Sequence, residues 1–298
     1  MALPSEVRPR QFGVSLDRPN GSTRPRRAVE IAPAEGWPAI DFAELWAYRG
    51  LLLLLVWRDV KSRYSQTVLG AGWAVLQPVL PMVIFSIVFG RFARIPSDGV
   101  PYPLFCLAGL VPWTYFASAL SGGGGSLILN RNLLTKVYFP RLVIPGAQGL
   151  AALVDFAIAT AVLLLALLAA GIVPGIGGML FLPILVVTVS MTAMGAGSWL
   201  AALSVQYRDV RHLSPFLVQI WMYASPIAYP MSLVPEAYRP FYALNPMAGL
   251  ITAFRALLLG TPGPTPLELG LSMTGALAIF LAGTVYFRHA ERVFPDVA

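Results

Sequence analysis

The fold is decided by residues 145–170, which read PGAQGLAALVDFAIATAVLLLALLAA. Asp155 is the one charged residue in this stretch, and about 20 predominantly apolar residues are enough for a helix to cross the hydrocarbon core of a bilayer. Comparable apolar stretches give six expected spans, at about 70–90, 104–126, 145–170, 179–205, 214–234 and 266–287. The sequence therefore predicts an all-α integral membrane protein with six transmembrane helices.

The composition agrees with this fold class. Hydrophobic residues make up 57% of the 298 residues and charged residues 12%, and the mean hydropathy is +0.69. Soluble domains have about 45–50% apolar and about 25% charged residues, so an ordinary soluble enzyme is excluded. One cysteine and two histidines far apart in sequence exclude a disulfide within the chain and predict no metal site.

The net charge of +7 is compatible with a nucleic-acid partner until the position of each charge is considered. When the N-terminus is placed inside, 17 of the 21 Lys and Arg residues fall on the cytoplasmic side of the six spans. Positive charge marks the cytoplasmic loops of membrane proteins. We therefore expect cytoplasmic N- and C-termini and no nucleic acid.

The N-terminal region is expected to divide into a tail and an interface helix. Residues 1–38 hold six arginines and little apolar clustering, which predicts a disordered Arg/Pro-rich cytoplasmic tail. Residues 39–66 are predicted as an amphipathic interface helix, because the apolar centre at 51–57 is too short to span. A soluble helix docked on a partner is the alternative. Residues 67–290 form the membrane domain, and 291–298 the cytoplasmic C-terminus.

The connection between spans two and three is short, basic and ended by a proline. This pattern suits a surface helix that transmits force from a soluble partner, although any basic loop satisfies the charge rule. Its members are Asn130, Arg131, Asn132, Leu133, Leu134, Thr135, Lys136, Val137, Tyr138, Phe139, Pro140 and Arg141. The basic turn at 207–212 has the same ambiguity, between a topology signal and a phosphate-binding mouth.

Prolines interrupt the fifth span at Pro215, Pro226 and Pro230 and continue beyond it. Broken helices at membrane depth are tolerated only inside protein or along a cavity. We therefore expect either re-entrant helices between spans five and six, forming an extracytoplasmic gate, or an external loop with an amphipathic helix. The candidate gate residues are Pro235, Glu236, Tyr238, Arg239, Tyr242, Asn245, Pro246 and Arg255.

Aromatic residues gather in spans two and five. They are compatible with interfacial belts and equally with a channel in which rings stack on sugars. The candidate channel residues are Trp113, Tyr115, Phe116, Trp221, Tyr223 and Tyr229. Asp155 is expected to have a hydrogen-bonded packing role or a place near the cytoplasmic end of its span, rather than a role in a proton relay. The glycines at 122–125 are not followed by Lys-Ser/Thr, so no nucleotide-binding loop is present and close helix packing or a hinge is expected.

Several motifs occur in order along about residues 45–290. They are WRDVKSRY at 57–64, VLG at 68–70 with 73–78, PYPL at 101–104, GLVPW at 109–113, LTKVYFPR at 134–141, YRDV at 207–210, Ser225-Pro226 with Tyr229-Pro230, and LNPM at 244–247. As an ordered set they resemble the permease subunit of type-2 ABC transporters that export polysaccharides.

The resemblance implies a homodimer that works with two copies of a P-loop ATPase subunit, which carry the ATP and Mg. The implied substrate is an undecaprenyl-diphosphate-linked glycan, such as O-antigen, capsule or teichoic acid, crossing the bacterial cytoplasmic (inner) membrane. Residues 130–141 would form the coupling helix, 40–63 the interface helix, and 234–259 the gate. No catalytic residue is expected on this chain. The candidate contacts to the lipid diphosphate are Arg58, Lys61, Arg63 and Arg208.

Two other classes of protein are weighed against this one. A secondary transporter needs coupling-ion sites, for which Asp155 alone is poor support. A membrane-embedded glycosyltransferase needs acidic catalytic residues near a loop, and the acids expected outside are single: Asp98, Glu236 and Glu268.

Overall fold

The computed structural model describes residues 42–65, 67, 69–136, 139–207 and 209–291. These residues belong to one compact unit, Pro38–Ala298. Every regular element among them is a helix, as predicted. The tail predicted for 1–38 and most of the C-terminus, 292–298, lie outside the described residues, as does Arg208.

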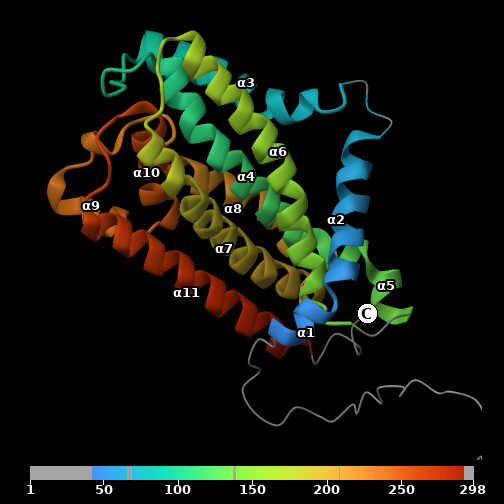
Figure 1. The fold of residues 1–298 in the computed structure, drawn as a ribbon. Helices are drawn as coiled ribbons and strands as arrows, with labels where there is room; N and C mark the ends of the chain where they lie inside the picture. Colours follow the sequence, from blue (N-terminus) through green and yellow to red (C-terminus); the bar gives the residue numbers. More distant parts are fainter. Residues whose placement is uncertain (1–41, 66, 68, 137–138, 208, 292–298) are drawn as a thin grey trace, which may run out of the picture. The chain divides into compact units, whose positions relative to one another are not determined.

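Five helices are long and apolar enough to cross a membrane (Figure 1). Four of them are α4 (Tyr102–Leu129), α6 (Val143–Ala169), α7 (Ile176–Gln206) and α11 (Pro266–Glu291). The fifth is α3 (Gly72–Phe85), which continues without a break through the π-helix η1 (Ser86–Phe92). These five match predicted spans one to four and six. The count rises to six if one bent helix pair is taken as a span.

The predicted span at 214–234 is helical over only part of its length. Its helix, α8 (Val210–Tyr223), has 14 residues, about 21 Å at 1.5 Å per residue. The helix ends there because Pro226 and Pro230 have no N–H to donate to the preceding turn. The interruption that the prolines predicted for this span is therefore present, and the α-helix ends at Tyr223.

The chain nevertheless passes from one end of the bundle to the other between residues 210 and 230. Gln206 and Leu129 mark one end, from which the short helix α5 (Arg131–Lys136) leads to α6; we call it the α5 end. At the opposite end, the Tyr102 hydroxyl donates to the carbonyl of Ala228 at 2.6 Å. The fifth crossing therefore consists of a helix followed by a non-helical segment.

Between this crossing and α11 the chain folds back into the bundle. After η2 (Met231–Leu233), η3 (Glu236–Tyr238) and α9 (Arg239–Tyr242), the helix α10 (Pro246–Leu259) begins, and the two halves of the bent pair meet at 110°. The Leu244 carbonyl lies opposite Gly275, well inside α11, whereas Leu257 lies against Gly178 at the start of α7. The geometry is that of a re-entrant pair, as the prolines predicted.

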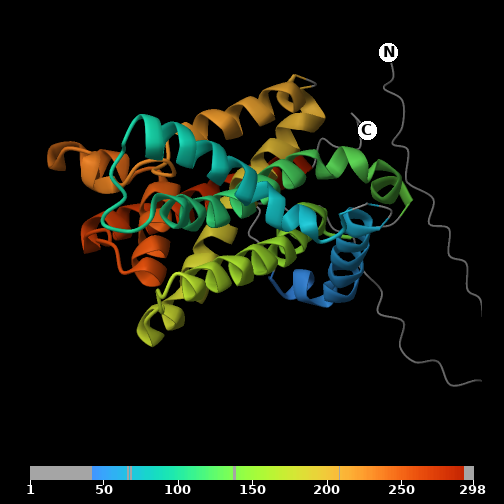
Figure 2. The same cartoon turned by 90° about the horizontal axis from the view of Figure 1, so that it is seen from above.

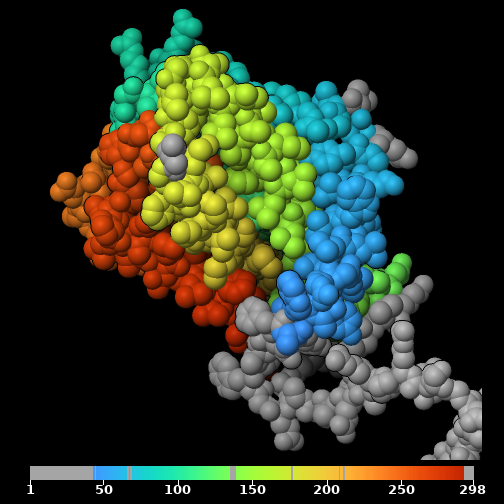
Figure 3. All heavy atoms as spheres, in the orientation of Figure 1, coloured from blue at the N-terminus to red at the C-terminus, as the bar shows by residue number. Residues whose placement is uncertain are grey.

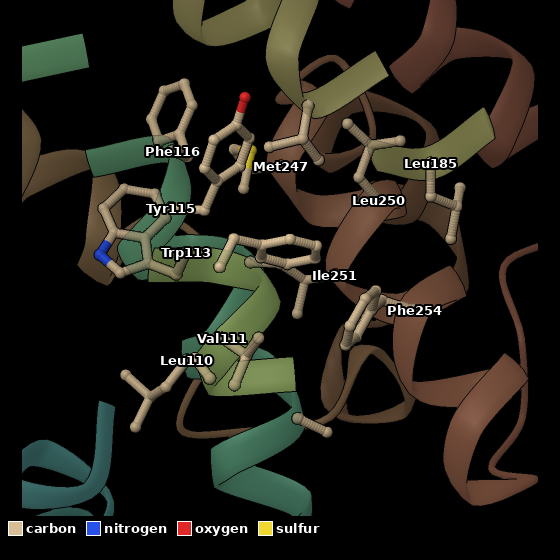
Figure 4. Packing of buried hydrophobic residues seen from close by; sticks show 14 of the residues in the cluster. Leu110, Val111, Trp113, Tyr115, Phe116, Leu185, Met247, Leu250, Ile251 and Phe254 are labelled. Carbon is tan, nitrogen blue, oxygen red and sulfur yellow. The ribbon is translucent and has the colours of Figure 1, made fainter. Parts of the chain in front are cut away.

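Helix α4 is at the centre of the bundle. It contacts α3, α6, α7, α8 and α10, and Figure 2 shows it beside α3. Its buried side chains pack with those of α7 and α10 in the main apolar core, where Trp113, Phe116 and Phe254 contribute large rings (Figure 4). The predicted packing role of the glycines is confirmed: a Cβ on Gly123 would lie 3.3 Å from the Cα of Gly197 in α7.

The predicted interface helix is two helices, α1 (Phe42–Ala47) and α2 (Arg49–Tyr64). They are separated at Tyr48, whose backbone (φ −93°, ψ 15°) is not helical. Helix α2 packs against α6 and lies beside it on the surface (Figure 3). Its last residue bonds to Asp155, which is twelve residues into α6, or about 18 Å. Unlike a helix lying flat in the interface, α2 is inclined along α6.

Candidate functional site

The predicted surface helix forms over Arg131–Lys136, as α5. At its start Asn130 is buried, and its side-chain amide donates to the Ser126 carbonyl at 2.9 Å. The backbone carbonyl of Asn130 accepts from the Leu133 N–H at 2.9 Å. Leu133 and Leu134 pack against the apolar cluster below, and Arg131 is exposed. A short helix with one apolar and one solvated face is therefore present at the predicted place.

The loop after α5 is attached to the end of α11. Phe139 is buried, and Arg141 donates from Nη1 to the Glu291 carbonyl at 3.1 Å. Its guanidinium also lies 3.8 Å from the Glu291 carboxylate. Val137 and Tyr138 lie outside the described residues. Arg141, just before α6, is therefore attached to the end of α11.

The four predicted contacts to a lipid diphosphate have different environments. The Arg58 guanidinium lies 2.8 Å from the carboxylate of its neighbour Asp59, and its side chain is 49% exposed. Lys61 is also exposed. Arg63 forms an ion pair with Asp155 at 2.5 Å. Because Arg208 lies outside the described residues, the accessible basic residues of this set are Arg58 and Lys61.

Asp155 is hydrogen-bonded, as one of the two predictions for it proposed. It accepts from the Arg63 guanidinium through Oδ2 and from the Tyr64 hydroxyl through Oδ1. Burial, the hydrogen bond to Asp155 and the carboxylate charge raise the pKa of Tyr64 to about 12, so the phenol keeps the proton that it donates. Gln148, about two turns before Asp155 in α6, donates from its side-chain amide to Asp59 of α2 at 2.6 Å. These polar contacts attach α2 to α6.

The predicted channel aromatics separate into two groups. Trp113, Tyr115 and Phe116 are buried in the core of the chain, where their rings are not accessible to a substrate. By contrast, Tyr223 is 60% exposed, and Trp221 and Tyr229 are partly exposed. The channel prediction therefore keeps a structural basis only for the three aromatics of the fifth crossing.

Trp221 also lines an open apolar groove of about 650 Å³ between α7, α8, α11 and the re-entrant pair. Three other large rings line this groove: Trp199, Phe241 and Tyr242. Sequence reasoning missed Trp199 and placed Phe241 only within the predicted gate region. They come from segments far apart in the chain, and no sequence pattern brings them together.

Asn245 joins the two broken elements at the centre of the gate region. Its Oδ1 accepts from the Trp221 indole at 2.8 Å and from the Met247 N–H at 3.1 Å, which caps α10. Its amide donates to the Ala224 carbonyl at 2.9 Å and to Ser225 Oγ at 3.0 Å. The last turn of α8 is thereby fixed to the first turn of α10.

Arg255 is the buried charged residue among the candidate gate residues, with 2% of its surface exposed. Its guanidinium donates to the carbonyls of Phe105, Pro226 and Ile227 at 3.0, 2.6 and 2.5 Å. The other members, except Pro246, are partly or fully exposed. Tyr242 and Tyr229 share a hydrogen bond at 2.6 Å, and Arg239 donates to the Val234 carbonyl at 2.8 Å. Pro246 is buried at N1 of α10, whereas Glu236 and Tyr238 are exposed and Pro235 begins η3.

Among the described residues no group of three or more His, Cys, Asp or Glu side chains comes together. The polar side chains of this region bond mostly to backbone carbonyls and to one another. The arrangement holds broken helices in place inside the bundle and leaves a groove and a surface helix at its edge. Such a fold and site define a multi-pass membrane transport component.

Comparison with known proteins identifies the family. Residues 50–259 match the model of the ABC-2 type transporter family, and the chain belongs to this family. It is 32% identical over 253 residues to the O-antigen export system permease protein RfbA of Myxococcus xanthus, which covers 83% of this chain and 95% of that protein.

More distant relatives belong to the same group. RfbA of Klebsiella pneumoniae is 27% identical over 209 residues, covering 70% of this chain and 80% of that protein. The polysialic acid transport protein KpsM of Escherichia coli is 23% identical over 229 residues, covering 77% of this chain and 87% of that protein. These relatives are transport permeases, which agrees with the predicted non-enzymatic role.

Proposed function

We propose that the chain is the membrane subunit of an ATP-driven polysaccharide exporter in the bacterial cytoplasmic membrane. Two copies would act with two copies of a separate P-loop ATPase, which binds ATP and Mg. The substrate would be an undecaprenyl-diphosphate-linked glycan of the O-antigen class. Membership of the ABC-2 family and the names of the relatives support the class of substrate.

The observation that carries the coupling to ATP is the attachment of α5. This helix begins at buried Asn130, which is bonded to the last turn of α4, and the chain that follows it reaches Arg141, which is bonded to Glu291 at the end of α11. A partner that moves α5 would therefore move the ends of three membrane helices rather than an independent loop. Closure of an ATPase dimer against α5 is a mechanism that uses this connection.

The substrate path is proposed to begin at α2 and end at the re-entrant pair. Exposed Arg58 and Lys61 offer positive charge to a diphosphate, and the aromatic rings of the fifth crossing offer faces on which sugars stack. Both termini lie on the cytoplasmic side in this scheme, because the basic residues concentrate at the α5 end.

The test is transfer of glycan in vesicles that contain the chain, the ATPase and a lipid-linked glycan. We expect transfer only when both subunits and ATP are present. Arg131→Glu, on the exposed side of α5, should reduce transfer and co-purification of the ATPase by about fivefold or more, because one interface charge pair is worth roughly 1 kcal/mol and reversal adds repulsion.

Arg91→Glu is the matched control, since Arg91 is an exposed arginine at the end of η1, away from α5. It should leave transfer within the error of the wild type. Transfer that continues without the ATPase would refute the proposed function. An equal loss for both charge reversals would refute the role of α5.

A further inference from the structure

Arg255 is a buried cation without a carboxylate partner among the described residues. It lies in α10, with 2% of its surface exposed, and its side chain forms no ion pair with an Asp or Glu of this region. An ionised side chain at membrane depth is costly and usually has a functional reason. The gate prediction included Arg255 but did not explain how the charge is accommodated.

Backbone carbonyls from two elements surround the guanidinium. From α4, the carbonyl of Phe105 accepts from Nε at 3.0 Å, and the Phe105 ring lies 3.7 Å from the guanidinium carbon. From the non-helical segment, Pro226 and Ile227 accept from Nη1 and Nη2 at 2.6 and 2.5 Å, and Tyr229 from Nη1 at 3.5 Å. Arg255 therefore joins α10, α4 and the segment after α8.

The sequence explains why this segment needs a donor from elsewhere. In a helix the carbonyl of residue 226 would accept from the N–H of residue 230, and that residue is Pro230, which has none. An unsatisfied carbonyl inside a membrane bundle costs several kcal/mol. The planar guanidinium offers five donors in a fixed geometry, so this side chain supplies the donor that Pro230 lacks and also bonds to the carbonyl of Ile227.

Gly109 provides the space for this arrangement. A Cβ at position 109 would lie 3.0 Å from Cζ of Arg255 and closer still to Nη2. Alanine at 109 would therefore press on the guanidinium from the side of α4 without changing any charge. The absence of a side chain at position 109, within the motif GLVPW, therefore leaves room for the Arg255 guanidinium.

We infer that Arg255 is a positioning residue of the gate: it holds the non-helical half of the fifth crossing, residues 224–230, against α4 and so keeps the end of the path opposite α5 closed at rest. This inference rests on the proposed transport function. The same segment is attached by Tyr102 to Ala228 at 2.6 Å and by Tyr229 to Tyr242 at 2.6 Å. Opening the path would require the guanidinium contacts to break together.

The experiment uses the full chain, with its ATPase, in vesicles loaded with a small fluorescent dye. Arg255→Gln should raise dye release without nucleotide by about tenfold per inserted molecule, the change expected for losing one hydrogen bond to a charged group. Gly109→Ala should act in the same direction. Arg255→Lys, which keeps the charge but not the planar fork, should release dye at an intermediate rate.

Cys106, the only cysteine of the chain, reports on the same contacts. It is fully buried and follows Phe105, so a small thiol reagent should label it slowly in the wild type and faster in Arg255→Gln. Arg91→Gln, at an exposed arginine outside the gate, is the control and should change neither release nor labelling.

The outcomes separate the two proposals. If Arg255→Gln inserts normally and its vesicles are as tight as the wild type, Arg255 is not a gate residue, even if Cys106 becomes reactive. If Arg255→Gln fails to insert, dye release is compared between the wild type and the variants Gly109→Ala and Arg255→Lys. Vesicles as tight as the wild type for both variants would show that Arg255 is not a gate residue. Failure of wild-type protein to transfer glycan with ATP would overturn the proposed function, whereas dye release would still measure the gate.

Discussion

At the scale of single residues, Asp155 and Arg255 show two different ways in which the helical body accommodates a charge. Asp155 meets opposite charge and a phenol donor from α2, namely Arg63 and Tyr64. The hydrogen bonds of the Arg255 guanidinium go to backbone carbonyls, and an aromatic ring lies against it. The contacts of Asp155 attach α2 to α6. The contacts of Arg255 provide hydrogen-bond donors for carbonyls of the non-helical segment after α8.

The ion pair between Arg63 and Asp155 should stabilise the docking of α2. Both side chains are partly exposed on the surface of the chain, at 28% and 17%, so we expect Asp155→Asn to cost about 1–2 kcal/mol, less than a fully buried pair would. A double-mutant cycle with Arg63→Gln, followed by thermal unfolding in detergent, should give a coupling free energy of about 1 kcal/mol.

Arg58→Gln is the control for that cycle, because Arg58 pairs with an adjacent residue on the exposed side, and its effect should add independently to that of Asp155→Asn. If the losses of unfolding free energy in Arg63→Gln and Asp155→Asn simply add in the double variant, the predicted coupling is contradicted. The same Asp155→Asn variant tests the secondary-transporter alternative, since ATP-dependent transfer that is retained would exclude Asp155 as a coupling-ion site.

At the scale of elements, proline and glycine decide where helices stop and how closely they cross. Pro226 and Pro230 end α8 after Tyr223 and make the rest of the crossing dependent on side-chain donors. Glycines set the crossing of α7 and α11, where a Cβ on Gly195 would lie 2.6 Å from the Ile279 carbonyl. Without an apolar driving force between helices in lipid, such close approach is a main source of packing energy.

Gly283→Ala should destabilise the bundle, because its Cβ would fall on the backbone of Gly195. We expect a cost of about 1–3 kcal/mol, typical of overpacking, measured as a lower thermal unfolding midpoint in detergent. Gly270→Ala is the control in the same helix, since a Cβ there meets nothing within 4 Å. It should be neutral or slightly stabilising, and equal effects of the two changes would refute the close crossing.

At the scale of the whole molecule, the distribution of charge agrees with the arrangement of helices in the described unit. α5, the start of α6 and the end of α11 meet at one end, where Arg141 and Glu291 interact. The re-entrant pair begins and ends at the opposite end, near Pro266. Energy coupling and gating are thus proposed at opposite ends of the same bundle.

Cysteine labelling in intact cells tests this orientation. On a Cys106→Ala background, Val173→Cys, in the exposed turn between α6 and α7, should react with a membrane-impermeant maleimide from outside. Asn132→Cys on α5 should react only after permeabilisation, because the basic connections stay inside. The reverse pattern would place the re-entrant pair in the cytoplasm and refute both the proposed gate and the proposed coupling helix.

The sequence by itself determined the membrane class, five of the six crossings, the short surface helix and the broken helices before α11. These features follow from local properties: apolar length, charge position, and the missing N–H of proline. The same reasoning left open how much of the fifth crossing is helical and whether Trp113, Tyr115 and Phe116 line a channel or form interfacial belts. Hydropathy does not distinguish a ring that faces a path from one that faces a neighbouring helix.

Only the tertiary structure decided which residues meet. Arg63 and Asp155 are 92 positions apart, and Arg255 and Phe105 are 150 apart. These contacts depend on how helices are inclined and where glycines let them approach, neither of which a single sequence pattern encodes. The sequence alone shows that residue 255 is charged. Its carbonyl partners follow from the packing of the helices, because a buried polar group is stable only where the fold supplies hydrogen-bond partners.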